Sequence, residues 1–399
     1  MSAETINGAR IVLETLHRLG VTDMFGYPGG AVIPIYDEIY SFPEIKHYFV
    51  RHEQGAAHAA DGYARVSGRV GVCLATSGPG ATNLVTGIMT AYMDSVPMVA
   101  ITGQVGRPFI GKDSFQEADI QGITMPITKH NYLVQDIHDL PRIIKEAYFI
   151  AGTGRPGPVL IDIPKDIQTE KISMAEYNKL YEVPIHLEGY DPTYKGHQGQ
   201  IKKAATLIKN AKRPLIIAGA GVLKSGAMDE LKELAEKAQI PVTNTLVGLG
   251  GFPGDHELAL GMVGMHGSVA ANNSTDEADL VIAAGIRFHD RITGHPDFFC
   301  KKAKIIHIDI DPAEIDKNVT INVPIVGDLK QVLTELNALV EPTTHEAWLE
   351  QIREWQAEYP MVIPESKNDV LHAQYVLSEL NKIAKEDAII VSDVGQHQM

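Results

Sequence analysis

The sequence predicts an α/β protein built from successive parallel-sheet domains, each with helices on both faces of its sheet (a three-layer arrangement). Short apolar segments rich in β-branched residues alternate with longer segments of helical periodicity along most of the chain. Glycine-rich turns directly follow several of the apolar segments. The 399 residues exceed the size of one ordinary hydrophobic core, so two or three domains are expected.

The first domain is expected over residues 1–170, where strands and helices alternate regularly. Strands are predicted where short apolar runs end at a turn, at residues 23–27, 46–50, 70–76, 98–102 and 158–163. Helices are predicted where apolar residues recur at helical spacing, at residues 4–19, 31–40, 53–66, 81–94 and 142–151. Helical crossovers between short strands make the sheet parallel.

A second α/β domain is expected over residues 195–340, after an interdomain linker at 170–200 in which prolines and glycines interrupt the pattern. Its predicted strands lie at residues 214–218, 280–284 and 305–309, and its helices at 201–209, 228–238 and 328–339. A polar helix at 343–360 is expected to be a second connector. A helix at 368–385 and a strand at 388–392 are expected to begin a third domain, over residues 365–399.

Composition and charge exclude several classes of protein. With 35 Lys and Arg against 50 Asp and Glu, the formal net charge is −15, which argues against nucleic acid or an anionic membrane as a partner. No apolar run approaches the roughly 18–20 residues of a membrane span, and the N-terminus lacks a signal-peptide pattern. The two cysteines, Cys73 and Cys300, have no metal-ligand spacing, so a reducing, cytoplasmic location is expected.

The fifteen residues from Arg51 to Arg65 are the most informative stretch. Glu53 directly follows an aromatic and β-branched run at 47–50 and opens an Ala/Gly-rich helix. An acid at the end of a buried parallel strand is where α/β enzymes place catalytic groups, and in an apolar setting it can exchange protons near neutrality. The alternative is a glutamate stabilised by the helix dipole without a catalytic role.

Other turns on the first domain could also contact a ligand. Those at 27–30 and 77–80 bring the backbone close to the end of the sheet, although ordinary Pro-Gly turns are the alternative. Arg155 and Lys165 flank the strand at 158–163, and either can bind an anionic group or form a surface ion pair.

In the second domain, the turn Gly219-Ala220-Gly221 lies between a strand and a helix, as in sites that bind phosphate at a helix N-terminus. Alone this pattern is weak, and a tight turn without a ligand is the alternative. Two further strands end near Arg287 and Asp309, where arginine can bind phosphate and a carboxylate can bind ribose hydroxyls. For Asp311 the alternative is a helix cap.

Together these segments resemble the catalytic subunit of the acetolactate synthase (acetohydroxyacid synthase) family of thiamine-diphosphate enzymes. The resemblance covers essentially the whole chain in order and spacing. Its motifs are FGYPGG (25–30), RHEQGAAHAADGYAR (51–65), TSGPGATNLVTG (76–87), ITGQV (101–105), DSFQEADI (113–120), GRPGPVLIDIPKD (154–166), GAGV (219–222), GMVGMHG (261–267), GIRFHDRITG (285–294), HIDIDPAEI (307–315) and SDVGQHQM (392–399).

The resemblance implies a thiamine-diphosphate-binding fold over residues 1–170, a Rossmann-like FAD-binding domain over 195–340 and the start of a second thiamine-diphosphate-binding fold over 365–399. The family's Gly-Asp-Gly…Asn motif for diphosphate and Mg²⁺ does not occur here. The magnesium ligands are therefore expected beyond Met399, and the chain is expected to be a truncated version of a longer protein.

The resemblance also implies an activity. Glu53 matches the glutamate that hydrogen-bonds the cofactor's aminopyrimidine and, by exchanging a proton with it, activates the thiazolium carbon. Gly30, Phe115, Gln116 and Lys165 match residues of the substrate channel. The implied reaction decarboxylates pyruvate and transfers the two-carbon unit to a second pyruvate or to 2-oxobutyrate. This is the first common step of valine, leucine and isoleucine biosynthesis.

Further cofactor contacts follow from the resemblance. Gly395, Gln396 and His397 match the first diphosphate contacts. His289 stands where many relatives have aspartate, while its neighbours agree with the family. The flavin has no net redox role in the family's main reaction, and its site is expected at Arg155, Gly219, Ala220, Gly221, Met265, His266, Gly267, Arg287, Asp290, Arg291, Asp309, Ile310 and Asp328.

The family's active sites lie between subunits, so a homodimer or tetramer is implied, with a small regulatory subunit as a further partner. Two alternatives remain open from the sequence. One is another thiamine-diphosphate enzyme, such as a pyruvate oxidase or a sulfoacetaldehyde acetyltransferase. The other is a non-catalytic, FAD-binding fragment, since residues 1–399 in isolation are expected to be inactive.

Overall fold

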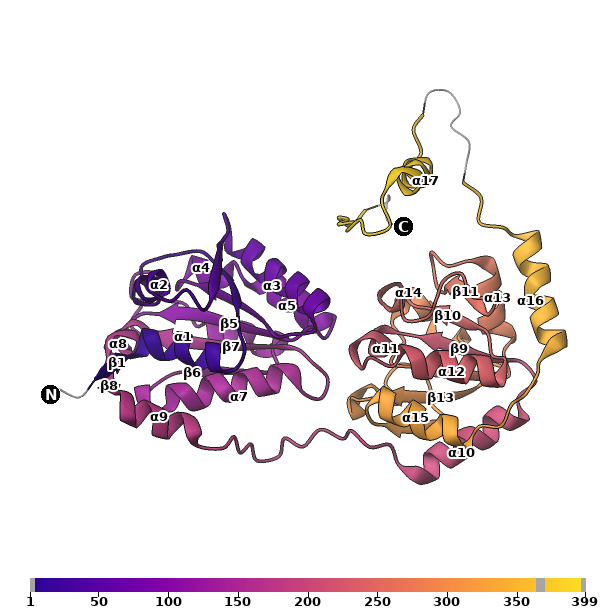
Figure 1. Cartoon of the computed structure of the whole chain (residues 1–399), viewed down its shortest axis with the longest axis horizontal. Helices are drawn as coiled ribbons and strands as arrows, with labels where there is room; N and C mark the ends of the chain where they lie inside the picture. The colour runs from indigo at the N-terminus through magenta and orange to yellow at the C-terminus, as the bar shows by residue number, and fades with distance from the viewer. Residues whose placement is uncertain (1–3, 364–369, 396–399) are drawn as a thin grey trace. The chain divides into compact units, whose positions relative to one another are not determined.

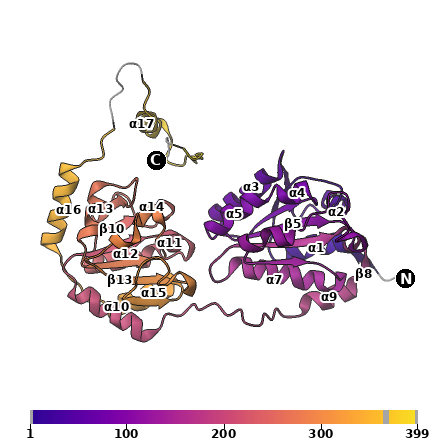
Figure 2. The same ribbon diagram turned by 180° about the vertical axis from the view of Figure 1, so that it is seen from behind.

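The computed structural model describes residues 4–363 and 370–395, which form two compact units, Met1–Pro192 and Thr193–Met399. Figure 1 and Figure 2 show the two units from opposite sides, each a sheet flanked by helices. The predicted α/β class is confirmed, because all neighbouring strands in both six-stranded sheets are parallel.

The sheet of the first unit has the strand order β3-β2-β4-β5-β7-β6. Its strands are β2 (Asp23–Gly26), β3 (Lys46–Phe49), β4 (Gly71–Ala75), β5 (Met98–Gln104), β6 (His130–Leu133) and β7 (Pro158–Pro164). The central strands β4, β5 and β7 are buried along their whole length, as expected for strands covered on both faces.

Two hydrophobic cores form because successive side chains of each strand point to opposite faces. On β4, Val72 and Leu74 pack with α1 and α7, whereas Cys73 and Ala75 pack with α3 and α5. Figure 1 shows these two helix pairs on opposite faces of the sheet. The helices of this unit are α1 (Gly8–Arg18), α2 (Ile33–Tyr40), α3 (Glu53–Ser67), α4 (Pro79–Thr82), α5 (Val85–Met93), α6 (Ile120–Thr124), α7 (Leu140–Gly152), α8 (Lys165–Thr169) and α9 (Met174–Glu182).

The predicted linker at 170–200 is wrong in its first part. Strand β8 (Lys171–Ser173) pairs antiparallel with β1 (Thr5–Asn7), and α9 follows it within the first unit. Tyr177 of α9 is fully buried, and its hydroxyl lies 3.3 Å from Thr15 Oγ1. These contacts join segments far apart in the sequence, so local composition did not predict them.

The sheet of the second unit has the order β11-β10-β9-β12-β13-β14, with the chain running outward on both sides of the β9–β12 pair. Its strands are β9 (Pro214–Ala218), β10 (Val242–Asn244), β11 (Ala259–Met262), β12 (Leu280–Ala284), β13 (Lys304–Asp309) and β14 (Val323–Val326). Its helices include α10 (Gln198–Asn210), α11 (Ala220–Lys224), α12 (Met228–Ala238), α13 (Val269–Glu277), α14 (Asp290–Thr293), α15 (Leu329–Leu339) and α16 (Glu346–Glu358).

Helix α16 is part of the second unit, so its prediction as a mere connector is wrong. Trp348 is 4% exposed, packs in the hydrophobic core, and donates its indole N–H to Pro214 O at 3.0 Å. A tryptophan with a buried, hydrogen-bonded indole anchors the helix against the first residue of β9.

The last described segment contains α17 (Ala373–Ile383), which has no buried residue. The strand predicted at 388–392 is wrong, because this segment is not paired with any strand in the described part of the chain. Ile389 and Val391 are 90% and 91% exposed, respectively. A strand requires a neighbouring strand to satisfy its backbone groups, and the alternation of apolar residues cannot supply one.

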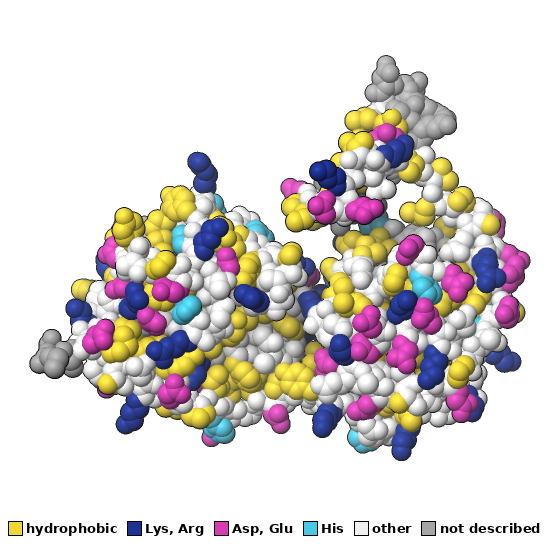
Figure 3. All heavy atoms as spheres, viewed as in Figure 1, with side chains coloured by type: hydrophobic (Ala, Val, Ile, Leu, Met, Phe, Trp, Pro, Cys, Tyr) yellow, Lys and Arg dark blue, Asp and Glu magenta, His cyan; other side chains and the backbone are white. Residues whose placement is uncertain are grey.

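Charged side chains of both signs are interspersed over the visible face of each unit (Figure 3). Within the described ranges, no helix combines the length and apolar character needed to cross a bilayer. Both cysteines are free and buried.

Gly71 sets how closely α3 can approach the sheet, because a Cβ at this position would lie 2.1 Å from Ala60 O in α3. We expect Gly71→Ala to destabilise the first unit by about 1–3 kcal/mol, since the backbone of α3 would have to shift. Denaturant unfolding followed by far-UV circular dichroism measures the change.

Gly62→Ala is the matched control in α3, because a Cβ there meets no atom within 4 Å. This variant is expected to gain about 0.5–1 kcal/mol from helix propensity. Equal stability of the two variants would show that the α3–β4 contact does not depend on Gly71.

Candidate functional site

The carboxyl ends of the parallel strands of the first unit gather five connecting segments at one edge of its sheet. The turn at 27–30 follows β2, Glu53 follows β3 and the turn at 77–80 follows β4. The loop at 105–119 follows β5, and Lys165 follows β7. The predicted catalytic and substrate-channel residues of this unit, Gly30, Glu53, Phe115, Gln116 and Lys165, therefore all belong to this edge.

Glu53 is the first residue of α3 and is only 8% exposed. Its Oε2 accepts a hydrogen bond of 2.9 Å from Asn83 Nδ2, and its Oε1 lies 3.2 Å from where a Cβ on Gly80 would stand. The carboxylate is therefore held by α3 on one side and by the segment after β4 on the other. Sequence reasoning missed Asn83, because its contact with Glu53 crosses from one helix to the next.

The two glycine turns meet at Thr76, the residue after β4. A Cβ on Gly29 would lie 2.4 Å from Thr76 Cγ2, and one on Gly80 would lie 2.6 Å from the same atom. Thr76 Oγ1 accepts from Ala31 N at 3.0 Å. Both turns are thus in direct contact beside Glu53. A Cβ on Gly30 meets nothing within 4 Å, so Gly30 borders open space.

An uncharged pair of side chains lies behind Glu53. Tyr36 Oη is 3.1 Å from His47 Nε2. Burial, followed by the charges of Glu53 and Cys73, raises the pKa of Tyr36, while burial lowers the pKa of His47. Neither group contributes a charge near neutral pH.

The loop at 105–119 brings Gln116 onto the turn after β4. Gln116 has a φ of +58°, and a Cβ on Gly78 would lie 2.6 Å from Gln116 O. Arg107 Nε donates to Asp166 Oδ2 at 2.7 Å, which ties the loop to the helix that begins at Lys165. The side chains of Phe115, Gln116 and Lys165 are exposed. They are available to a ligand and are not part of the core.

In the second unit, the glycine turn lies where the strand order reverses, between β9 and β12. Gly219 N donates to Ala284 O at 2.9 Å, and Gly221 N donates to Gly285 O at 3.1 Å. A Cβ on Gly219 would lie 2.3 Å from Gly285 O. The close crossing of two turns thus explains these glycines, as the tight-turn alternative expected, and their N–H groups are engaged by backbone.

Two other predicted flavin segments lie together. Met265 N donates to Arg291 O at 3.0 Å, so the loop after β11 lies against α14. Met265, His266, Asp290 and Arg291 are exposed, whereas Gly267 and Arg287 are half-buried. Arg291 Nη1 donates to Asp290 Oδ2 at 3.0 Å.

The carboxylates after β13 and β14 all accept backbone hydrogen bonds. Asp309 Oδ1 accepts from Asp311 N, and Asp311 Oδ1 accepts from Ala313 N, both at 2.9 Å. The capping alternative for Asp311 is therefore confirmed. Asp328 caps α15 through Gln331 N at 3.0 Å. Ile310 is half-buried between Asp309 and Asp311.

The remaining predicted contacts belong to other parts of the chain. Arg155 belongs to the first unit, where its Nε donates to Ser95 Oγ at 2.8 Å. Gly395 lies in the last described segment, outside both sheets. Gln396 and His397 lie outside the described residues. Among the residues that are described, no three His, Cys, Asp or Glu side chains form a group able to hold a metal ion.

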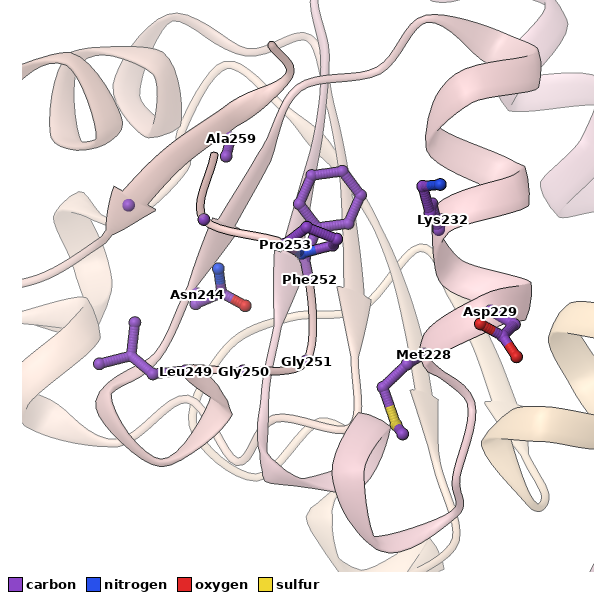
Figure 4. A pocket seen from close by; sticks show the side chains of 12 residues that line it. Met228, Asp229, Lys232, Asn244, Leu249, Gly250, Gly251, Phe252, Pro253 and Ala259 are labelled. Atoms are coloured by element: carbon purple, nitrogen blue, oxygen red, sulfur yellow. The ribbon is translucent and has the colours of Figure 1, made fainter. Parts of the chain in front are cut away.

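A pocket of about 400 Å³ opens on the second unit between α12 and residues 249–254. Figure 4 shows Phe252 and Pro253 on one side of it, with Met228, Asp229 and Lys232 of α12 opposite. None of the residues predicted to bind flavin lines this pocket. Its lining includes Asn244, the last residue of β10.

Comparison with known proteins connects both units to one family. Residues 6–123 match the family described as thiamine pyrophosphate enzyme, N-terminal TPP binding domain, and residues 201–336 match its central domain. The chain is 50% identical over 405 residues to an acetolactate synthase of Mycobacterium bovis, covering 100% of this chain and 65% of the relative.

Two further relatives agree. The chain is 50% identical over 401 residues to the acetolactate synthase large subunit of Corynebacterium glutamicum, covering 99% of this chain and 63% of the relative. It is 48% identical over 400 residues to the large subunit of Buchnera aphidicola, covering 99% of this chain and 69% of the relative. The chain thus spans about two thirds of the length of the curated relatives it matches.

His307 on β13 predicts an acid sensitivity of the second unit. The ring is fully buried, its Nε2 donates to Ile286 O at 2.7 Å, and burial lowers its pKa. Below about pH 6.5 the unfolded chain takes up a proton that the folded ring resists, so stability falls as the pH falls from that value. Above it, both states are neutral and His307 adds no pH dependence.

We expect His307→Gln, which keeps a donor but does not titrate, to flatten this loss of stability between about pH 6.5 and 5. Tryptophan fluorescence reports on the second unit alone, because both tryptophans, Trp348 and Trp355, lie in α16. Parallel pH profiles of variant and wild type would contradict this role of His307.

Proposed function

Since the chain belongs to the acetolactate synthase large-subunit family, we propose that it supplies the pyrimidine-side catalytic residues of an acetolactate synthase. The proposed reaction joins two 2-oxo acids with loss of carbon dioxide: two pyruvates give 2-acetolactate, and pyruvate with 2-oxobutyrate gives 2-aceto-2-hydroxybutyrate. The observation that carries this proposal is the placement of Glu53, which is buried at the carboxyl edge of its sheet and held by Asn83.

The residues around Glu53 fit the pyrimidine side of thiamine diphosphate. Bound there, the cofactor would supply a thiazolium carbon that adds to a keto group and stabilises the charge left by decarboxylation. Glu53 would hold and exchange a proton at the pyrimidine ring. Gly80 supports this assignment, because a Cβ there would lie 3.2 Å from Glu53 Oε1, so the glycine keeps the space beside that oxygen open.

The exposed side chains at the same edge suit the substrate. Lys165 would attract the carboxylate of a 2-oxo acid, and the amide of Gln116 could donate to a developing alkoxide. Phe115, 87% exposed, would cover the apolar end of a small acid, and Gly30 leaves room for it. These roles are proposed from family membership and from the exposure of the side chains.

We propose FAD at the carboxyl edge of the second sheet, where the order of strands reverses. Contact between Met265 and Arg291, together with the exposed His266 and Asp290, supports this place. Magnesium is proposed from the family alone, because the described residues include no group of side chains suited to a metal ion.

The proposed assembly is a homodimer or tetramer, with a small regulatory subunit as a further partner, and the proposed location is the cytoplasm. Helix α5 supports association, because it leaves Met89, Tyr92 and Met93 at 40%, 36% and 40% exposure. Apolar side chains gathered on one short helix are typical of surfaces that bind another protein.

Glu53→Ala tests the catalytic proposal. In the full-length protein, we expect loss of acetolactate formation from pyruvate and a decrease of about 100-fold or more in the exchange of the thiazolium proton with solvent. Exchange is followed by proton NMR after acid quench. An unchanged exchange rate in this variant would refute the role of Glu53. Product analysis with phosphate or an electron acceptor distinguishes a synthase from an oxidase.

Asn83→Ala tests whether the position of Glu53 matters beyond its presence. Loss of a hydrogen bond to a charged group, worth about 1.5–3 kcal/mol, should slow thiazolium proton exchange roughly tenfold or more. Thr86→Ala is the control on α5, because the Thr86 side chain is exposed. Equal exchange rates in Asn83→Ala and wild type would show that α3 alone orients the carboxylate.

A further inference from the structure

Gln104 joins the two ends of the loop at 105–119. It is the last residue of β5 and is 4% exposed. Its amide nitrogen donates to Ala118 O and to Asp162 Oδ2, both at 2.9 Å, and its amide oxygen accepts from Val105 N at 2.9 Å. Every polar atom of this side chain is therefore used, and two of its partners are the first and next-to-last residues of the loop.

Asp162 fixes the orientation of that amide. It lies on β7 opposite Thr102 of β5, and its side chain accepts from Thr102 Oγ1 at 2.7 Å as well as from Gln104. Burial and the charge of Asp119 raise the pKa of Asp162 to about 7, against the effect of the two hydrogen bonds. A flipped Gln104 amide would place its oxygen against Ala118 O and its nitrogen against Val105 N, so only the observed orientation suits all three partners.

The loop is attached to the rest of the unit near both of its ends. None of the residues from 105 to 119, all of which are described, is buried. Glu117 accepts from Gly111 N and Ser114 N, which shapes the loop internally without attaching it to the sheet. Near the start of the loop, the Arg107 side chain donates to Asp166, Glu170 and Gln135 O. Gln104 is the attachment that reaches the far end of the loop, through Ala118 O.

We propose that Gln104, locked by Asp162, is a positioning residue that sets the conformation of the 105–119 loop and thereby the placement of Phe115 and Gln116. Contact of Gln116 with Gly78 extends this placement to the turn beside Glu53. The consequence for substrate use rests on the proposed function. The consequence for the loop does not, and can be measured without activity.

Gln104→Met removes the hydrogen bonds at similar side-chain volume. Trypsin cleavage after Lys112, an exposed residue of the loop, measures how often the loop opens. We expect cleavage at Lys112 in the variant to be about tenfold faster than in the wild type, because hydrogen bonds of ordinary strength are lost. Cleavage at the wild-type rate would overturn the proposal.

Two controls separate loop placement from general destabilisation. Asp162→Asn can still accept from Gln104 through its oxygen and donate to Thr102 through its nitrogen, so its cleavage rate should stay within about twofold of the wild type. Thr15→Val loses the contact with Tyr177 on α9, away from the loop. Acceleration at Lys112 equal to that of Gln104→Met in this control would also overturn the proposal.

Kinetics of the full-length protein test the effect on substrate. Gln104→Met is expected to raise KM for pyruvate about tenfold with an unchanged affinity for thiamine diphosphate, because the loop carries Phe115 and Gln116 but not Glu53. An unchanged KM, or an equal loss of cofactor affinity, would refute the substrate half of the proposal. Absence of acetolactate from the wild type would refute the proposed function and leave the cleavage result to decide the loop.

Discussion

The parallel direction of the strands is the constraint on which the rest of the first unit depends. Parallel neighbours need a helical crossover between them, so every strand of the sheet ends at the same edge. That edge collects a glycine turn from β2, an acid from β3, a second glycine turn from β4 and a long loop from β5. No pair of these segments is adjacent in sequence, yet the topology alone makes them neighbours.

Close glycine contacts then fix how these segments lie against one another. Gly29 and Gly80 lie against the side chain of Thr76, and neither leaves room for a side chain of its own. Gly78 lies against the backbone of Gln116, and Gly103 lies against that of Ala31. Side chains in contact can change rotamer, whereas backbone in contact cannot, so the edge is stiff at Gly78 and Gly103. The groups suited to bind a ligand, such as Lys165, are exposed above this stiff base.

The sequence predicted those elements whose signal is local. Strands β9 and β12 and helix α12 have the predicted bounds, because each is a short apolar or amphipathic run closed by a turn. Strands β6, β10, β11 and β14 were not predicted, since all four are short, and β6 and β10 also carry polar residues such as His130 and Asn244. The alternation of strands and helices predicted that site residues lie at strand ends. The family resemblance predicted the role of each of these residues.

Non-local contacts were beyond such reasoning. Pairing of β1 with β8 joins opposite ends of the first unit, and Trp348 reaches back to Pro214. Asn83 lies in the motif TSGPGATNLVTG (76–87), but its hydrogen bond to Glu53 depends on how α3 packs beside α5. Likewise, Gln104 and Asp162 read as ordinary polar residues at strand ends until β5 and β7 are placed side by side.

Two buried acids of the first unit, Asp162 on β7 and Glu53 at the start of α3, differ in what surrounds them. Asp162 lies between strands with donors to both oxygens, and its pKa of about 7 means that folding is increasingly disfavoured as pH rises from about 4 to 7. Asp162 is buried away from ligands and costs stability, and its role in orienting the Gln104 amide explains why it is there. Glu53 lies at the open edge, with Asn83 on one oxygen and a glycine beside the other. Of the two, only Glu53 lies at the edge where we propose that the cofactor binds.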